Sequence, residues 1–158
     1  MDTDRGDIAL TDPIMGGLRV EMDRGLPDVF TSAFAHVDEP DPDESGPSVR
    51  AEALRSRKRV VEPDVATSLV CTDPVARNAM LAARVNAVQS TPLISANGRC
   101  HGVVSTADDR VGRTLSAEEA ADLDVIARDA GSYLAWHHGT IVLDALEHLH
   151  QTALQTCR

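Results

Sequence analysis

The chain has 158 residues and a mass of 16.9 kDa, a length that fits one domain. Hydrophobic residues make up 42% of it and charged residues 25%, so it can bury a core and is not a disordered chain. Asp and Glu total 25 against 15 Lys and Arg, a formal net charge of −10, and aromatic residues are only 3%. Nucleic acids bind clustered cations and aromatic platforms, so we expect no nucleic-acid partner.

Targeting signals and cysteines bear on the compartment. No apolar run reaches the roughly 20 residues that span a bilayer, so we expect no membrane partner. Residues 1–7 are acidic and polar, so we expect no secretory signal. Cys71, Cys100 and Cys157 are odd in number and far apart, which argues against a disulfide framework and predicts a cytoplasmic protein.

The first half of the chain alternates short elements with loop signals. Two strands, Ile8–Asp12 and Leu18–Asp23, flank Gly16-Gly17 and predict a β-hairpin. The spacing predicts a helix from Asp28, as its cap, through Val37. Prolines and repelling carboxylates predict a loop over Asp38–Pro47.

Two helices and a strand follow. We expect a helix over Ser48–Ser56 and a short strand at Arg59–Val61, which Glu62-Pro63 ends. Asp73-Pro74 opens another helix, because proline is tolerated in the first turn. Its expected inward face consists of Val75, Ala79, Met80 and Ala83.

The strongest local signal is a second hairpin. Ala87–Ser95 and Arg99–Thr106 are strand-like runs joined by Ala96-Asn97-Gly98, and Asn-Gly favours a tight turn because both residues accept positive φ. Adjacent apolar pairs predict that this hairpin lies in the middle of the sheet. Pro92 cannot donate to a strand ladder, so it must occupy a bulge or a non-bonded position.

A long helical pattern closes the chain. Ser116 and Glu119 form a capping box, so a helix starts there. We expect it to bend or break at Gly139 and to continue as a terminal helix. The expected inward residues are Leu123, Ile126, Ala127, Ala130 and Leu134, and a second apolar stripe contains Ile141, Val142, Ala145, Leu146, Leu149 and Ala153. This order of elements predicts an α+β fold with an antiparallel sheet.

Several segments resemble one family. Val85–Thr106 resembles the core hairpin of a GAF domain, with "AVQSTPL" and "GVVST" in place, and is most similar to the sensory subset of actinobacteria and proteobacteria. The helix Leu115–Trp136, the segment Arg59–Val65 and the opening hairpin Asp7–Val20 also resemble their GAF counterparts. The resemblance covers roughly residues 6–138.

This resemblance implies a PAS-related fold, with a central antiparallel sheet of five or six strands flanked by helices. It implies a sensory domain over residues 1–138 and a signalling or dimerisation helix over 139–158. The function expected is binding of a small molecule in signal transduction, acting on a partner or output module. Two departures stand out, since GAF domains normally begin with a helix that Met1–Gly6 is too short to form, and little sequence follows Thr140.

The expected ligand-binding residues are polar positions in the second hairpin. They are Gln89, Ser90, Thr91, Cys100 and Ser105. By strand alternation Gln89 and Thr91 point one way and Ser90 the other, and the sequence leaves open which set faces the GAF cavity. We also expect a ligand-sized hollow between the sheet and Phe30–Met80.

The sequence does not predict a metal site, a particular cofactor or an enzyme. The adjacent pair Cys100-His101 cannot share one strand face, and Asp144 with His148 supplies only two ligands, so no metal site is expected and no cofactor is identified. We expect no enzyme activity, because Cys71 lies beside Asp73 rather than a cation. The alternatives are a ligand-free dimerisation module and a cysteine-dependent methionine sulfoxide reductase. The second apolar stripe predicts a homodimer, the competing arrangement being a terminal helix folded back on a monomer.

Overall fold

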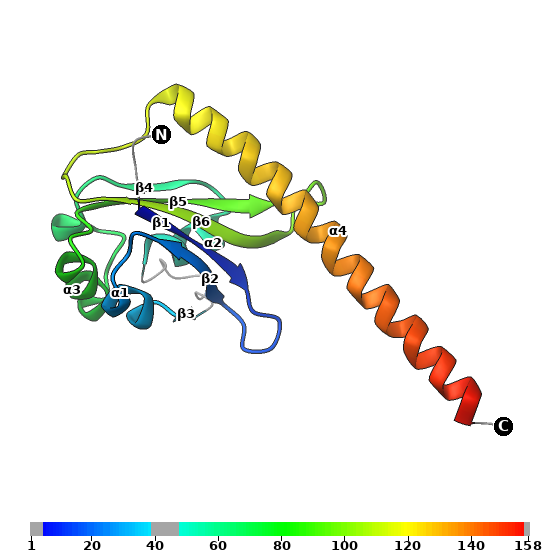
Figure 1. Cartoon of the computed structure of the whole chain (residues 1–158). Coiled ribbons are helices and arrows are strands. Elements are labelled where there is room, and N and C mark those ends of the chain that lie inside the picture. The colour runs from blue at the N-terminus through cyan, green and yellow to red at the C-terminus, as the bar shows by residue number, and fades with distance from the viewer. Residues whose placement is uncertain (1–4, 39–47, 157–158) are drawn as a thin grey trace.

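One antiparallel sheet organises the molecule (Figure 1). The computed structural model describes residues 5–38 and 48–156, with the backbone alone for 150–156. Within these residues, six strands lie in the order β3-β2-β1-β6-β5-β4, and every neighbouring pair is antiparallel. The strands are β1 Arg5–Thr11, β2 Leu18–Arg24, β3 His36–Val37, β4 Val60–Glu62, β5 Ala87–Ile94 and β6 Cys100–Asp108. The predicted α+β fold with five or six strands is confirmed.

The β5–β6 hairpin lies inside the sheet, between β4 and β1, as predicted. Ser95 N–H donates to the Arg99 carbonyl (3.0 Å), and Gly98 has φ +80°, which an L side chain rarely adopts. The register shifts between Pro92 and Ile94. This irregularity accommodates the proline that the ladder cannot use as a donor.

Three short helices pack on one face of the sheet. They are α1 (Asp28–Ala33), α2 (Val49–Ser56) and α3 (Pro74–Ala82), and a 3-10 turn covers Val65–Thr67. Side-chain caps start two of them, because Ser48 accepts from the Ala51 N–H and Asp73 accepts from the first-turn N–H groups of α3. The core between helices and sheet includes Phe30, Phe34, Val49, Met80, Leu18 and Val103.

Some local predictions are wrong because tertiary contacts override helical spacing. The helix that begins at Asp28 ends at Ala33, and Val37 instead pairs with Leu18 of β2 as part of β3. Val75 and Ile126, expected to face inward, are 74% and 62% exposed. Residues 39–47, most of the predicted loop, lie outside the described residues.

A single helix, α4 (Ala117–Thr156), covers the other face of the sheet. It is 40 residues long, which corresponds to roughly 60 Å, and its C-terminal half extends beyond the sheet (Figure 1). The capping box is confirmed, since Ser116 N–H donates to Glu119 Oε2 (3.0 Å) and Glu119 N–H donates to Ser116 Oγ (3.3 Å). Leu123 and Ala127 are buried against the strands.

The helix does not break at Gly139, so that prediction is wrong. A Cβ at Gly139 would meet nothing within 4 Å, so this glycine marks no close approach. The propensity cost of one glycine is about 1 kcal/mol, too little to end a long helix. The predicted domain boundary between residues 138 and 139 therefore falls inside α4. No helix in the described part of the chain is long and apolar enough to cross a membrane.

Candidate functional site

The strand register divides the polar residues of the hairpin between the two faces of the sheet. Ser90 lies opposite Ser105, and Ser105 lies opposite Asp7 of β1, so these three side chains form one row on one face. This face packs on α2, because Arg50 of that helix binds Asp7. The next row contains Thr91, Val104 and Ile8 and lies on the face that α4 covers.

A buried ion pair lies on the face that α1, α2 and α3 cover, the helix-covered face of the sheet. Arg50 Nη2 donates to Asp7 Oδ1 at 2.5 Å, and the two side chains are 3% and 2% exposed. The guanidinium carbon lies 5.1 Å from the ring centroids of both Phe30 and Phe34, so it also makes cation–π contacts. A salt bridge at this depth is unusual, because charged groups lose their hydration when they are buried.

The pair is incompletely hydrogen-bonded. Among the described residues, Asp7 Oδ2 and Arg50 Nε and Nη1 are buried without a hydrogen-bond partner. Burial raises the pKa of Asp7 above its ordinary value, although the Arg50 charge and hydrogen bond act in the opposite direction. Buried polar atoms are normally paired, and leaving one unpaired costs about 1–3 kcal/mol. The pair therefore leaves one acceptor and two donors unsatisfied.

Two hydroxyls extend the same polar row. Ser90 Oγ and Ser105 Oγ lie 2.9 Å apart and are hydrogen-bonded to each other, and both residues are buried. Directly opposite residues in an antiparallel pair have Cβ atoms about 5 Å apart, so Ser105 lies next to Asp7. The hydroxyls and the ion pair form a continuous polar strip in an otherwise apolar core.

The remaining predicted ligand-binding residues lie elsewhere. Gln89 Nε2 donates to Thr106 Oγ1 (3.0 Å) on the α4 face, where Thr91 also lies. Cys100 pairs with Ile94 at the turn end of the hairpin, and its thiol donates to the Gly102 carbonyl (3.2 Å). Of the five predicted residues, the structure brings only Ser90 and Ser105 together beside the ion pair.

The predicted hollow between the sheet and Phe30–Met80 has a small counterpart. In the described part of the chain, a hollow of about 170 Å³ lies between the helices, and its lining consists of Ala33, Phe34, His36, Val37, Asp38, Ser48, Asp73, Val75 and Ala76. Phe34 lines it and also contacts Arg50, so the hollow lies next to the side chains around the ion pair. Ligand pockets commonly measure about 300–1,000 Å³. Residues 39–47, which connect Asp38 to Ser48, lie outside the described residues.

The described thiols have raised pKa values. Cys71 is fully buried and Cys100 is half-buried, and burial is the main cause of the rise for both. A thiolate is therefore less favoured at each position than at an exposed cysteine. Among the described side chains, no group of three or more His, Cys, Asp or Glu residues could hold a metal ion.

Sequence reasoning missed Asp7 and Arg50. Asp7 and Ala9 are the buried residues of β1 and face the helix-covered core. The signal was present in part, because Asp7 and Ala9 share a strand face and Arg50 lies among the apolar residues at the start of α2. Nothing in the sequence joins two residues that are 43 positions apart.

Comparison with known proteins rests on structure. No family model and no curated protein matches the sequence. A domain of a protein described as a two-component sensor histidine kinase, from Sinorhizobium meliloti 1021, is similar with a TM-score of 0.70 and 19% identity over 91% of this chain and 86% of that one. The GAF domain region of a Geobacter sulfurreducens PCA protein is similar with a TM-score of 0.64 and 18% identity, over 83% and 80% of the two chains.

The chain has the GAF fold. A third similar structure is the type II free methionine-R-sulfoxide reductase of Thermoplasma acidophilum, with a TM-score of 0.60 and 18% identity over 84% of this chain and 78% of that one. Free methionine-R-sulfoxide reductases from two further organisms are similar as well. The expectation of no enzyme activity is therefore wrong, because enzymes share this fold. Its premise that Cys71 has no cation beside it is also wrong, since Arg77 Nη2 donates to the Cys71 carbonyl (2.7 Å).

Proposed function

We propose that this GAF domain is a sensory module that binds a small molecule on the helix-covered face of its sheet. The observation that carries this proposal is the Asp7–Arg50 pair, which is buried yet keeps unpaired donors and an unpaired acceptor. A ligand with both hydrogen-bonding functions would satisfy these atoms and those of the neighbouring Ser90 and Ser105 hydroxyls. Similarity to a domain from a protein described as a sensor histidine kinase supports a role in signal transduction.

Native mass spectrometry of protein purified without added ligand tests this function. We expect a bound mass on the wild-type chain, and a ligand that raises the melting temperature as its concentration exceeds Kd. The variant Ser90→Ala/Ser105→Ala removes both hydroxyls without opening a large cavity, and should lower the occupancy. Gln89→Met is the matched control, because Gln89 lies on the opposite face.

The Ser90/Ser105 variant and the Gln89 variant therefore test the two faces of the sheet separately. Loss of the bound mass in the Gln89 variant alone would move the ligand to the α4 face and overturn the proposal. Absence of any bound mass or thermal shift would favour a ligand-free module instead.

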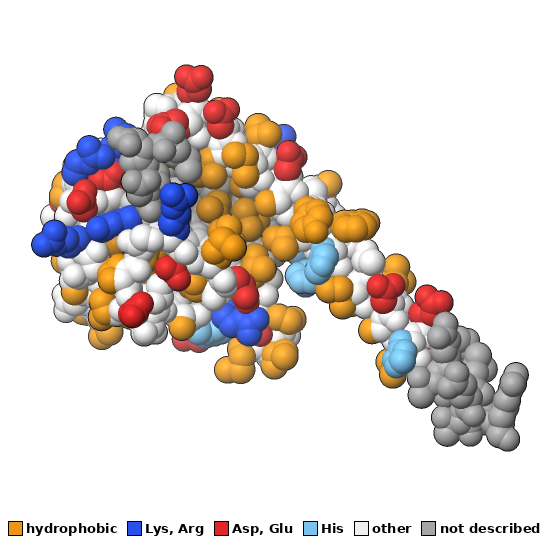
Figure 2. All heavy atoms as spheres, viewed as in Figure 1, with side chains coloured by type: hydrophobic (Ala, Val, Ile, Leu, Met, Phe, Trp, Pro, Cys, Tyr) orange, Lys and Arg blue, Asp and Glu red, His pale blue; other side chains and the backbone are white. Residues whose placement is uncertain are grey.

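We further propose that α4 forms a homodimer and carries the signal to a partner or output module. Hydrophobic side chains gather where α4 crosses the sheet and continue along its projecting half (Figure 2). Leu143, Leu146 and Leu149 are 68%, 58% and 63% exposed, and Val142 and Leu146 are four residues apart on one helix face. Such a stripe is unfavourable on a monomer, and two-fold pairing would bury the same residues on both copies.

Light scattering tests the dimer. We expect about twice the chain mass of 16.9 kDa for the wild type and the monomer mass for Leu146→Glu, because an interface would bury an unpaired carboxylate. Leu69→Glu is the control, since Leu69 is 90% exposed in the loop before α3. A wild-type mass near 16.9 kDa that neither substitution changes would refute the dimer.

A further inference from the structure

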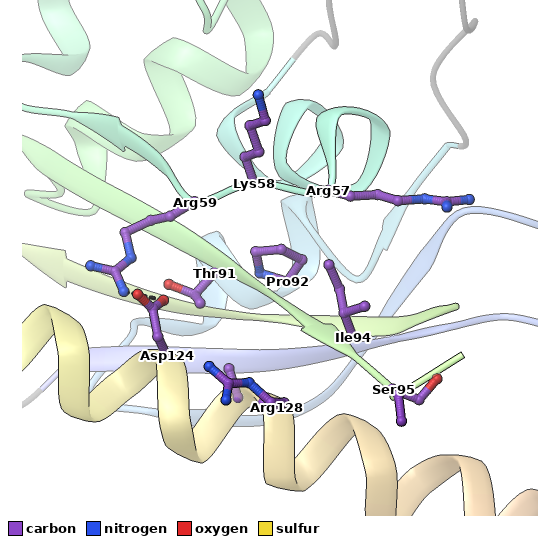
Figure 3. A pocket seen from close by; sticks show the side chains of 11 residues that line it. Arg57, Lys58, Arg59, Thr91, Pro92, Ile94, Ser95, Asp124 and Arg128 are labelled. Atoms are coloured by element: carbon purple, nitrogen blue, oxygen red, sulfur yellow. Dashed lines mark hydrogen bonds and ion pairs between the residues drawn. The ribbon is translucent and has the colours of Figure 1, made fainter. Parts of the chain in front are cut away.

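A second hollow lies at the edge of the sheet, where residues 91–94 of β5 run beyond their pairing with β4. It measures about 410 Å³, opens to the surface, and is bordered by the loop between α2 and β4, the end of β5 and the N-terminal half of α4 (Figure 3). This volume falls in the range of about 300–1,000 Å³ that is common for small-molecule sites. None of its lining residues belongs to the helix-covered row that contains Ser90 and Ser105.

Positive charge dominates the lining of this hollow. Arg57, Lys58 and Arg59 come from the loop and Arg128 from α4, whereas Asp124 is the one carboxylate among the described lining residues. Arg59 reaches across to Asp124 and binds it, and it also donates to a carbonyl of α4. Arg59 and Asp124 balance each other, so Arg128 supplies the excess positive charge beside them, and Arg57 and Lys58 add positive charge at the rim, in a chain of net charge −10.

Two buried donors in the hollow have no partner. Thr91 is 3% exposed, and its Oγ1 is buried without a hydrogen bond among the described residues. Arg59 Nε is also buried without a hydrogen bond among the described residues. In Figure 3 the Thr91 side chain points toward the space between Arg59 and Asp124. Both groups can donate, so an oxygen acceptor would satisfy them.

Part of the lining is apolar. Pro92 and Ile94 of β5 and Ala127 of α4 contribute this part. Figure 3 shows that Lys58 and Arg57 extend outward from the loop, so the inner part is polar around Thr91, Arg59, Asp124 and Arg128. A ligand that fits this lining carries a charged oxygen group at one end and an apolar body at the other.

We propose that this hollow is a second binding site, specific for a small organic anion. The anionic oxygens accept hydrogen bonds from Thr91 and Arg59, and the apolar body lies on Pro92 and Ile94. The anion competes with Asp124 for Arg59, so binding loosens the contact between α4 and the loop before β4. This site is independent of the ligand proposed for the helix-covered face.

Amide NMR with benzoate and phenyl phosphate as probes tests the site, and neutral benzamide is the matched comparison. We expect saturable shifts around Thr91, Ile94 and Ala127 with the two anions and weak shifts with benzamide. Comparing the two anions distinguishes carboxylate from phosphate recognition. Shifts that do not saturate, or that are equal for benzamide, would overturn the proposal.

Three variants sharpen the result. Thr91→Val keeps the shape of the side chain and should weaken binding about tenfold, because it removes a hydrogen bond to a charged group. Asp124→Asn should strengthen binding, since it removes the competing carboxylate. Arg128→Gln should weaken binding, whereas Arg113→Gln, which removes a cation outside the hollow, should not.

The variants also separate this site from the first one. If Arg128→Gln and Arg113→Gln change the affinity equally, the attraction is general and the proposal fails. Shifts confined to Ser90 and Ser105 would assign the probes to the helix-covered face. A failure of the Ser90→Ala/Ser105→Ala experiment has no effect on the probe affinities expected here.

Discussion

Replacing Arg50 by methionine tests the energetic role of the buried ion pair. Methionine fills much of the space between Phe30 and Phe34, so the packing loss is small and the main change is electrostatic. The substitution leaves the Asp7 carboxylate buried, with 2% of its side chain exposed and no counter-charge. It also removes the hydrogen bond to Oδ1, while Oδ2 is already unpaired.

The expected loss is large. Removing one partner of a buried pair typically destabilises a protein by about 3–5 kcal/mol, a large share of the usual 5–15 kcal/mol total. Replacing both partners, as in Asp7→Leu/Arg50→Met, should recover most of that loss, because buried pairs are often no more stabilising than apolar side chains. The coupling between the two positions then appears directly in a double-mutant cycle.

The destabilisation caused by Arg50→Met should depend on pH in a definite direction. Burial raises the pKa of Asp7 above its value in the unfolded chain, so the stability contributed by this group is present at low pH and is lost as pH rises through the folded pKa. Arg50 opposes that rise, so its removal should move the pKa further upward. The cost of Arg50→Met should therefore be greatest near neutral pH and shrink as pH falls.

Urea unfolding followed by circular dichroism measures these values, at matched protein concentration because a dimer's stability depends on it. Arg55→Met is the control on the same helix, where the more exposed Arg55–Glu52 pair should contribute about 0–1 kcal/mol. A loss of less than about 1 kcal/mol for Arg50→Met, with no pH dependence, would refute the reasoning.

Three further predictions concern α4 and the sheet. In thermal melts, Gly131→Ala should destabilise the fold by about 1–3 kcal/mol, since its Cβ would lie 2.6 Å from the backbone of β5. Gly139→Ala adds a Cβ that meets nothing within 4 Å, so it should stabilise the fold by about 1 kcal/mol. Burial lowers the pKa of His101 below 6.5, so stability should be constant above that pH and decline as pH falls through the lower folded value, and His101→Gln should remove this decline. Ser116→Ala should cost about 1 kcal/mol in urea unfolding through loss of the α4 cap, and an unchanged midpoint would contradict the capping role.

The sequence by itself determined the elements whose cause is local. Asn97-Gly98 requires only the tolerance of a tight turn for positive φ, and the Ser116–Glu119 box satisfies helix-end groups within one turn. Both features form as predicted. The central hairpin was also predictable, because its strands lack a continuous polar face.

Tertiary structure decided which face of each strand is buried and where helices end. Val37 has helical spacing from Phe30 and Phe34, but pairing with Leu18 makes it a strand residue. Glycine has a low helix propensity, but the free-energy cost of Gly139 is small compared with the hydrogen bonds of the helix on either side, so α4 continues through it.

The candidate sites also depend on contacts between residues far apart in the sequence. Ser90 and Thr91 are neighbours in sequence, yet one lies beside the Asp7–Arg50 pair and the other beneath α4. Strand alternation predicts that they separate, but only the packing of α2 and α4 assigns each face its partner. The ion pair itself joins residues 43 positions apart, a distance over which local patterns carry no information, so it appears only when the chain is folded.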